Sequence, residues 1–436
     1  MHTRIVMAIM TWFLVSGISA YPPALGAVKT DRPSGLLSQE HLRGSMQGQS
    51  GIALDLNGDG REDLVVGAPY AQRGGKGATG ALLVYLANPG GFSPKPSVLL
   101  EGDGNLGWSL VALGDVDGDG NADFAAGAFS GSSEVASLAG TVNIYKGSNP
   151  PQKVPGAVLS GENALDKFGY ALAVGDLNGD GYPDLIVGAP FHSPSPALYQ
   201  RGAVYIFFGP GYDQAKAVKI PATSANGGIG FSLATGDING DGVDDLLLQA
   251  SSKVICYYGS SGSFTPSAPN VVFSSSDGGF GKSIAVLPNG IVAMGADTAA
   301  VANVSESGNL SIFKLNTNVT PPSPELLVKI DGEPNCGRFG SAILPLPDIG
   351  DGTPGLAVSA VHADGNPWPV TGKIFLFSLT PGASGAVATP ARAFPGEARD
   401  MHLGTFLAQV AGGRKLAAGA PTENANTGSV RLFDLR

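Results

Sequence analysis

The sequence of 436 residues is poor in cysteine, histidine and charge. The first of its two cysteines, Cys256, lies in an expected strand and the second, Cys336, in a turn-rich segment, so we favour two free thiols over a pair. Charged residues make up only 14% of the chain, and the formal net charge of −10 leaves no basic excess for binding phosphates. The sequence therefore excludes a disulfide-built scaffold and predicts no nucleic-acid partner.

Long apolar runs are also rare, and the one that stands out is at the N-terminus. His2 and Arg4 precede the apolar run Ile5–Val15, which small residues follow. Because this run is too short for a membrane span of about 20 residues, it predicts a signal peptide over residues 1–20, with an anchor helix as the alternative. A linker is expected over residues 21–34. We therefore expect a protein without a membrane span that is secreted, or periplasmic in a Gram-negative bacterium.

Glycine and proline are abundant, with 65 and 32 copies, which indicates short strands separated by many turns. Most of the chain follows a repeat of about sixty residues. An Asp-rich segment of nine residues recurs four times at spacings of 60 or 61 residues. These segments cover residues 55–63, 115–123, 176–184 and 237–245. An aromatic or aliphatic residue followed by Gly stands upstream in several repeats, in the pairs Phe168-Gly169, Phe280-Gly281, Phe339-Gly340 and Leu403-Gly404. An alternating strand follows downstream. Seven such strands are expected to begin near Gly80, Gly140, Gly202, Lys253, Gly308, Gly372 and Gly428.

Seven repeats of four strands predict an all-β fold, a seven-bladed β-propeller over residues 35–436. The sequence reaches Arg436 directly after the third strand of the seventh repeat, and residues 35–38 resemble the outer strands of other repeats. Because an open ring would expose unpaired strand edges, we expect this N-terminal strand to complete the last blade. A linear solenoid is the alternative.

The Asp-rich segments predict calcium sites. Positions 1, 3, 5 and 9 offer side-chain oxygens, and glycines at positions 4 and 6 let the backbone fold tightly around one point. Oxygen ligands without His or Cys favour Ca²⁺. The start resembles an EF-hand, but the closing carboxylate comes at position 9 and a strand follows. The expected side-chain ligands of about four ions are Asp55, Asn57, Asp59, Asp63, Asp115, Asp117, Asp119, Asp123, Asp176, Asn178, Asp180, Asp184, Asp237, Asn239, Asp241 and Asp245.

The three remaining repeats depart from this pattern. Segments 287–290 and 411–414 offer no carboxylate, and segment 348–352 keeps two Asp residues but has Gly355 where the closing Asp belongs. We expect no calcium in these three repeats.

The Phe-Gly, Gly-Asp-Leu-Asn-Gly-Asp-Gly and Gly-Ala-Pro motifs resemble the FG-GAP repeat, which forms the seven-bladed propeller of integrin α subunits. The resemblance covers residues 35–436. It implies calcium in loops on one face and ligand binding on the opposite face. It also implies that the carbonyl at position 7 is a ligand, here in Arg61, Asn121, Tyr182 and Val243. The leg domains, transmembrane helix and inserted domain of an integrin have no counterpart, so we expect a free-standing propeller like those of many secreted microbial proteins.

No motif predicts an enzyme. His192 and His362 are expected in surface loops, and the Asp residues are committed to metal, which leaves no acid–base pair. Trp108 and Trp368 could stack on a sugar, although isolated aromatic residues more often pack internally. Three glycosylation sequons would be exposed acceptors if the host glycosylates, at Asn303, Asn309 and Asn318.

The sequence therefore favours a monomeric, secreted calcium-binding propeller that binds an extracellular protein or glycan, as an adhesion module would, without catalysis. The alternatives are a hydrolase or lyase with its site in the central funnel, and a purely structural surface component.

Overall fold

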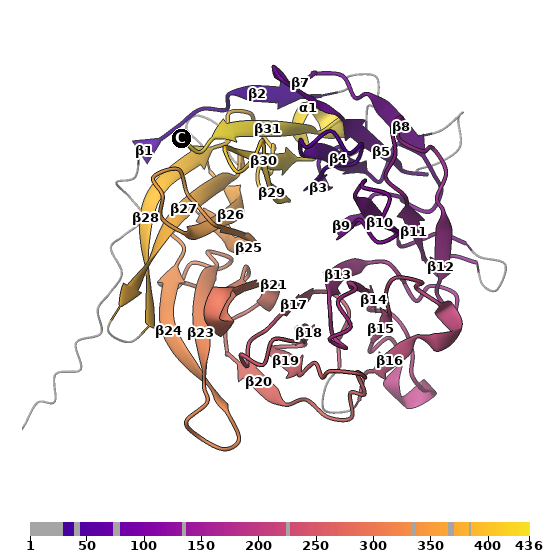
Figure 1. Cartoon of the computed structure of the whole chain (residues 1–436). Coiled ribbons are helices and arrows are strands. Elements are labelled where there is room, and N and C mark those ends of the chain that lie inside the picture. The colour runs from indigo at the N-terminus through magenta and orange to yellow at the C-terminus, as the bar shows by residue number, and fades with distance from the viewer. Residues whose placement is uncertain are drawn as a thin grey trace, which may run out of the picture.

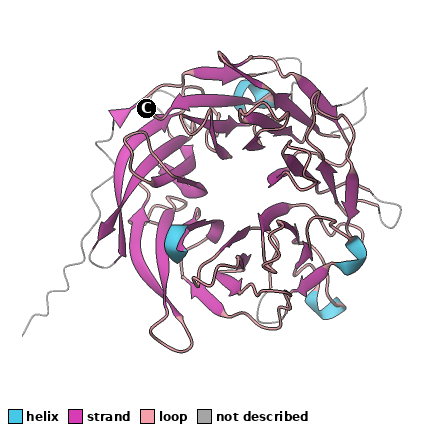
Figure 2. Ribbon diagram, viewed as in Figure 1, coloured by secondary structure: helices cyan, strands magenta, loops and turns pink. Residues whose placement is uncertain are grey.

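The computed structural model describes residues 29–38, 44–72, 79–132, 137–223, 227–333, 336–364, 370–382 and 385–436. Seven sheets, each with four antiparallel strands, stand in a ring around a common axis (Figures 1 and 2). The predicted seven-bladed β-propeller is confirmed, and the solenoid alternative was wrong. The predicted signal peptide, the linker up to residue 28 and Trp368 lie outside the described residues. No helix in the described ranges is long and apolar enough to cross a membrane.

The first four blades follow one plan, with second strands of six residues and third strands of five. Blade 1 has β3 (Ser50–Leu54), β4 (Asp63–Ala68), β5 (Ala81–Tyr85) and β8 (Val98–Glu101), with a small hairpin of β6 (Ala87–Asn88) and β7 (Gly91–Phe92). Blade 2 has β9 (Ser109–Gly114), β10 (Asp123–Ala128), β11 (Thr141–Tyr145) and β12 (Ala157–Ser160). Blade 3 has β13 (Ala171–Gly175), β14 (Asp184–Ala189), β15 (Ala203–Phe207) and β16 (Val218–Pro221). Blade 4 has β17 (Leu233–Gly236), β18 (Asp245–Ala250), β19 (Lys253–Tyr257) and β20 (Val271–Ser274).

Blades 5 and 6 have longer strands, and blade 7 combines both ends of the described chain. Blade 5 has β21 (Phe280–Leu287), β22 (Ile291–Ala296), β23 (Asn309–Asn316) and β24 (Ser323–Asp331). Blade 6 has β25 (Cys336–Leu346), β26 (Gly355–Ala363), β27 (Lys373–Gly382) and β28 (Gly385–Pro395). Blade 7 has β29 (Leu407–Val410), β30 (Lys415–Ala420), β31 (Ser429–Asp434) and β2 (Gly35–Leu37). Helical turns are short: η2 (Pro196–Leu198), η3 (Gln214–Lys216), η4 (Pro288–Gly290) and α1 (Glu423–Asn426).

The third strands begin within one residue of the predicted positions in every blade. The segment around Cys336 was expected to be turn-rich, but Cys336 begins the eleven-residue strand β25. Cys256 is a buried free thiol, as predicted, and burial raises its pKa well above the ordinary value.

The second strand of each blade is buried on both of its faces, because each sheet packs between two neighbouring sheets. The strand Asp184–Ala189 is buried along its whole length. Each pair of adjacent blades shares a hydrophobic cluster of its own; between blades 3 and 4, for example, Ile186 and Val204 pack with Leu246 and Leu248. A strand that is buried on both faces needs apolar residues at consecutive positions, which explains the continuous apolar runs after the Asp-rich segments.

Paired glycines let neighbouring blades approach closely. A Cβ atom added to Gly127 of β10 would lie 2.1 Å from the carbonyl oxygen of Gly169 in blade 3, closer than real Cβ contacts allow. Gly169 itself has a φ of 82°, a conformation that favours glycine. Ser109 of blade 2 donates a hydrogen bond of 2.8 Å to the same carbonyl oxygen. This contact explains why the Gly of Gly-Ala-Pro and the Gly of Phe-Gly recur together.

The N-terminal strand completes the last blade, as predicted. Strand β2 pairs antiparallel with β31, with Gly35 opposite Leu432. The structure adds a contact that the sequence did not indicate: β1 (Lys29–Thr30) pairs in parallel with β28 of blade 6. Arg392 of β28 connects these segments, because its guanidinium donates to Asp31 Oδ2 at 2.8 Å and to the carbonyl oxygens of Asp434 and Leu435 at 2.8 and 2.6 Å.

We predict that Arg392→Ala lowers the free energy of unfolding by about 1–3 kcal/mol, because it removes three charge-assisted hydrogen bonds between blade 6 and both ends of the described chain. Thermal denaturation followed by circular dichroism measures the effect. Arg399→Ala is the control, because the Arg399 side chain is 65% exposed and pairs only with the adjacent Asp400 in the described chain. Equal melting temperatures for the two variants would contradict the prediction.

Candidate functional site

Each of the four Asp-rich segments connects the first strand of its blade to the second. The segments occupy the same connection in blades 1 to 4, such as the one from β9 to β10, so they lie on one face of the ring. We call this face the loop face. The other face carries the connections from the second to the third strand and from one blade to the next.

The side chain at position 1 organises each loop around itself. In blade 2 the backbone N–H groups of Gly118, Asp119 and Gly120 donate to the Asp115 carboxylate at 2.8 to 3.1 Å. Gly118 and Gly120 have φ values of 76° and 90°, so the tight turn needs glycine at both positions. The same bond from position 6 to position 1 recurs in blades 1, 3 and 4. In all four loops position 5 also accepts a hydrogen bond from the N–H of position 7.

The Asp at position 9 is fully buried in all four loops. In blade 2 its two oxygens accept N–H bonds from Val116 at 3.3 Å and Gly147 at 2.8 Å, which fixes the loop to the end of the third strand. Equivalent pairs of bonds hold Asp63, Asp184 and Asp245.

Burial raises the pKa of these closing carboxylates, and the carboxylates of the same loop raise it further. The pKa rises to about 6 for Asp63 and Asp184 and to about 7 for Asp245. The pKa of Asp123 shifts in the same direction. A buried carboxylate beside other carboxylates is unfavourable in water alone and favourable beside a cation, so these loops fit a divalent metal ion.

In blade 2 the carboxylate oxygens lie close enough together to share a metal ion. Ligand oxygens of Asp115, Asp117 and Asp123 all lie within 4.8 Å of one another. Blades 1, 3 and 4 have Asn57, Asn178 and Asn239 in place of Asp117, and thus one carboxylate fewer. The Lys146 ammonium lies 2.5 Å from Asp117 Oδ2, so a protein cation already contacts the most acidic of the four loops.

Two of the three remaining repeats, those of blades 5 and 6, have different contents at the same connection. In blade 5 the connection is the short turn η4. In blade 6 Asp348 accepts from the N–H groups of Gly350 and Gly352, and the Arg436 guanidinium lies 3.2 Å from its Oδ2. The backbone hydrogen bonds and Arg436 lower the pKa of Asp348. Arg436 thus supplies the positive charge that an ion supplies in a metal loop.

The structure corrects two expectations for histidine. His192 is in a loop but is only 3% exposed, and its Nδ1 lies 2.7 Å from Oδ2 of the equally buried Asp166. His362 is half-buried and belongs to strand β26. Its ring centroid lies 5.0 Å from that of His402, so within the described chain it contacts another histidine and no buried carboxylate partner like that of His192. Burial lowers the pKa of both His362 and His402.

One expected glycosylation acceptor is also corrected. The Asn309 side chain begins strand β23 and is 1% exposed, so it is not an exposed acceptor. Asn303 and Asn318 are exposed.

An arc of aromatic rings lies on the face opposite the loop face. Trp108, Tyr170 and Phe231 directly follow the Phe-Gly-type glycine of blades 2, 3 and 4, and Phe129 and Phe191 follow the second strands of blades 2 and 3. Their ring centroids form a chain with spacings of 4.8 to 5.7 Å. We call these five residues the aromatic arc. Trp108 is half-buried in it, and Phe231 is 38% exposed. Aromatic residues at equivalent positions of consecutive repeats were the signal that sequence reasoning missed.

We predict that His192→Ala destabilises the fold by about 2–4 kcal/mol, because Asp166 would lose its buried partner. Urea denaturation followed by tryptophan fluorescence measures the change. His362→Ala is the control and should change stability less, because His362 is half-buried and contacts the ring of His402 instead of a buried carboxylate. An unaltered urea midpoint for His192→Ala would show that the pair contributes nothing.

Sequence comparisons place these features among known proteins. The FG-GAP repeat family matches residues 168–207 and 229–254, and the FG-GAP-like repeat family matches residues 49–126. Integrin alpha-7 of Mus musculus is 40% identical over 185 residues, and integrin alpha ina-1 of Caenorhabditis elegans is 36% identical over 188 residues. These alignments cover 40% and 37% of this chain, and 15% and 16% of the two integrins.

A third relative is named as an enzyme. Phosphatidylinositol-glycan-specific phospholipase D of Bos taurus is 29% identical over 361 residues, which is 71% of this chain and 42% of that protein. The chain thus spans less than half the length of each of these relatives. The repeats matched by the two families and the seven observed blades lead to one conclusion: the chain contains FG-GAP repeats within a seven-bladed propeller and is similar over part of its length to integrin α subunits.

Proposed function

We propose that this chain is an extracellular, calcium-binding propeller that binds a protein or glycan ligand without catalysing a reaction. The observation that carries the calcium assignment is the buried Asp at position 9 of four equivalent loops. A divalent cation would supply the positive charge that these carboxylates lack. The ion would be held by the side chains at positions 1, 3, 5 and 9 and by the carbonyl oxygen at position 7, as in Asn121 or Tyr182.

An oxygen-only donor set in a flexible loop favours Ca²⁺ over Zn²⁺ or other soft metals. The expected role of the ion is structural, because each loop connects two strands of a blade and is fixed through position 9 to the third. The similarity to integrins supports an adhesion role, and the predicted signal peptide supports an extracellular location.

The aromatic arc supports ligand binding on the face opposite the loop face. Partly exposed rings offer large apolar surfaces for sugars or for side chains of a partner. Lys167 lies 4.4 Å above the Phe129 ring, so a cation–π contact is already part of this surface.

A hydrolase or lyase is the second candidate, because a relative over 71% of the chain carries the name of a phospholipase D. His362 and His402 are the adjacent histidines that such a site would use, since lowered pKa values keep them neutral near pH 7. Hydrolysis of phosphodiester or glycosidic substrates that disappears in both His362→Ala and His402→Ala would favour the enzyme over the binding module.

Calcium removal tests the metal assignment. We predict that EDTA lowers the melting temperature, since calcium at ten times its Kd stabilises the fold by about 1.4 kcal/mol per site. Asp245→Asn should reduce the difference between EDTA and millimolar calcium, whereas Asp351→Asn, in the blade 6 connection, should leave it unchanged. Differential scanning fluorimetry measures both. A melting curve that is the same in EDTA and calcium would refute the assignment.

Ligand binding is tested on a glycan array and a panel of extracellular matrix proteins, with calcium present. We predict at least one saturable ligand whose binding falls about tenfold or more in Trp108→Ala, because the arc loses the large ring that contacts both Phe129 and Tyr170. Tyr182→Ala is the matched control, since this exposed aromatic side chain lies on the loop face. Binding that resists Trp108→Ala but not Tyr182→Ala would assign the ligand to the loop face.

A further inference from the structure

Blades 5 and 6 carry extra strand length on the loop face. The third strands of blades 1 to 4 have five residues, whereas β23 has eight and β27 has ten. In β27, Ser378 pairs with the first residue of β26, and Leu379 to Gly382 continue beyond it, paired only with β28. In β23, Leu315 and Asn316 likewise pair only with β24. These extensions project past the second strands, so they are not needed to close the ring.

An apolar cavity lies beside the β27 extension, which contributes Leu379 and Thr380 to its lining, and Lys314 of β23 lines it as well. Its volume is about 600 Å³, which is within the range of about 300–1,000 Å³ for small-molecule sites. It is on the loop face of the two consecutive blades that lack an Asp-rich loop, where the short turn η4 leaves room. The side chains that form most of its wall are Leu287, Pro288, Pro345, Leu346, Pro354 and Leu379.

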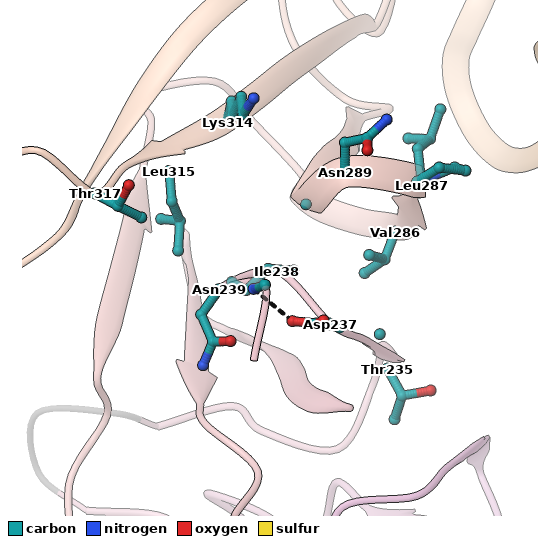
Figure 3. A pocket seen from close by; sticks show the side chains of 14 residues that line it. Thr235, Asp237, Ile238, Asn239, Val286, Leu287, Asn289, Lys314, Leu315 and Thr317 are labelled. Carbon is teal, nitrogen blue, oxygen red and sulfur yellow. Dashed lines mark hydrogen bonds between the residues drawn. The ribbon is translucent and has the colours of Figure 1, made fainter. Parts of the chain in front are cut away.

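Lys314 is the charged residue that lines this cavity. Its side chain is exposed, and no described carboxylate is within ion-pair distance of it; Glu325 lies opposite it across the β23–β24 ladder. Lys314 also lines a second cavity of about 580 Å³, which the blade 4 loop enters with Asp237 and Asn239 (Figure 3). Lys314 and Asn289, both labelled in Figure 3, line this second cavity as well as the apolar one.

The chemistry of the wall selects the kind of occupant. Pro288, Pro345, Pro347 and Pro354 have no backbone N–H, so they cannot satisfy the carbonyl groups of an extended peptide. An alkyl chain needs no hydrogen bonds, and burying it is favourable. The ammonium group of Lys314 at the rim favours an anionic end group and disfavours a cationic one.

We propose that this cavity binds a monomeric long-chain fatty carboxylate, with its alkyl chain among the prolines and leucines and its carboxylate at Lys314. Among the described residues that line this cavity, none belongs to the aromatic arc or to an Asp-rich segment. This proposal can therefore be tested separately from the proposed function.

The test uses the full chain, loaded with calcium and then freed of excess ion so that fatty carboxylates stay soluble. Isothermal titration calorimetry with dodecanoate, below its micelle concentration, should show one ligand per chain. Decanoate should bind about tenfold more weakly, since each buried methylene contributes to affinity. Dodecyltrimethylammonium, with the same tail and opposite charge, should bind at least tenfold more weakly than dodecanoate.

Variants locate the site. Lys314→Ala should weaken dodecanoate binding about tenfold, and Leu379→Glu should abolish it. Pro354→Glu repeats the second test at an exposed position in case Leu379→Glu fails to fold, which circular dichroism would reveal. Lys253→Ala is the matched control, because this exposed lysine begins the third strand of blade 4. The proposal is overturned if dodecanoate does not bind, if the cationic detergent binds equally well, or if Lys314→Ala and Pro354→Glu leave the affinity unchanged.

Discussion

The structure depends on the burial of each sheet between two others. In every blade the second strand is apolar on both faces, so no blade can stand alone in water. Only a closed ring covers both faces of all seven sheets. The close contact of paired glycines, as between Gly127 and Gly169, sets how near adjacent blades come. The hydrophobic clusters lie between blades and not within them. The loops can therefore vary from blade to blade while the ring persists.

The loop face illustrates this freedom. Four blades hold buried carboxylates that fit a cation, one holds an aspartate paired with Arg436, and one has a short proline turn beside an apolar cavity. The same connection in the same fold thus carries ionic, salt-bridged or apolar chemistry. Function in such a ring is a property of individual connections and strand extensions, and the propeller only places them.

Much of this arrangement could be predicted from the sequence, because each repeat carries its own local pattern. The blade number, the third strands and the pairing of residues 35–37 with the last blade follow from periodicity and turn residues. Contacts that are not part of the repeated pattern could not be predicted in this way. The burial of His192 depends on Asp166 in a neighbouring connection, the aromatic arc joins three blades, and β1 pairs with a strand more than 350 residues away.

Blade 7 joins β2, from the start of the described chain, to β29, β30 and β31 from its end. During synthesis β2 has no partner until β31 has been made, because Gly35 of β2 pairs with Leu432 of β31. Until then the early blades form an open arc with exposed apolar flanks, and such exposed surfaces are prone to aggregation. The same pairing protects both ends of the described chain from fraying, because releasing either β2 or β31 leaves the edge of the other strand unpaired.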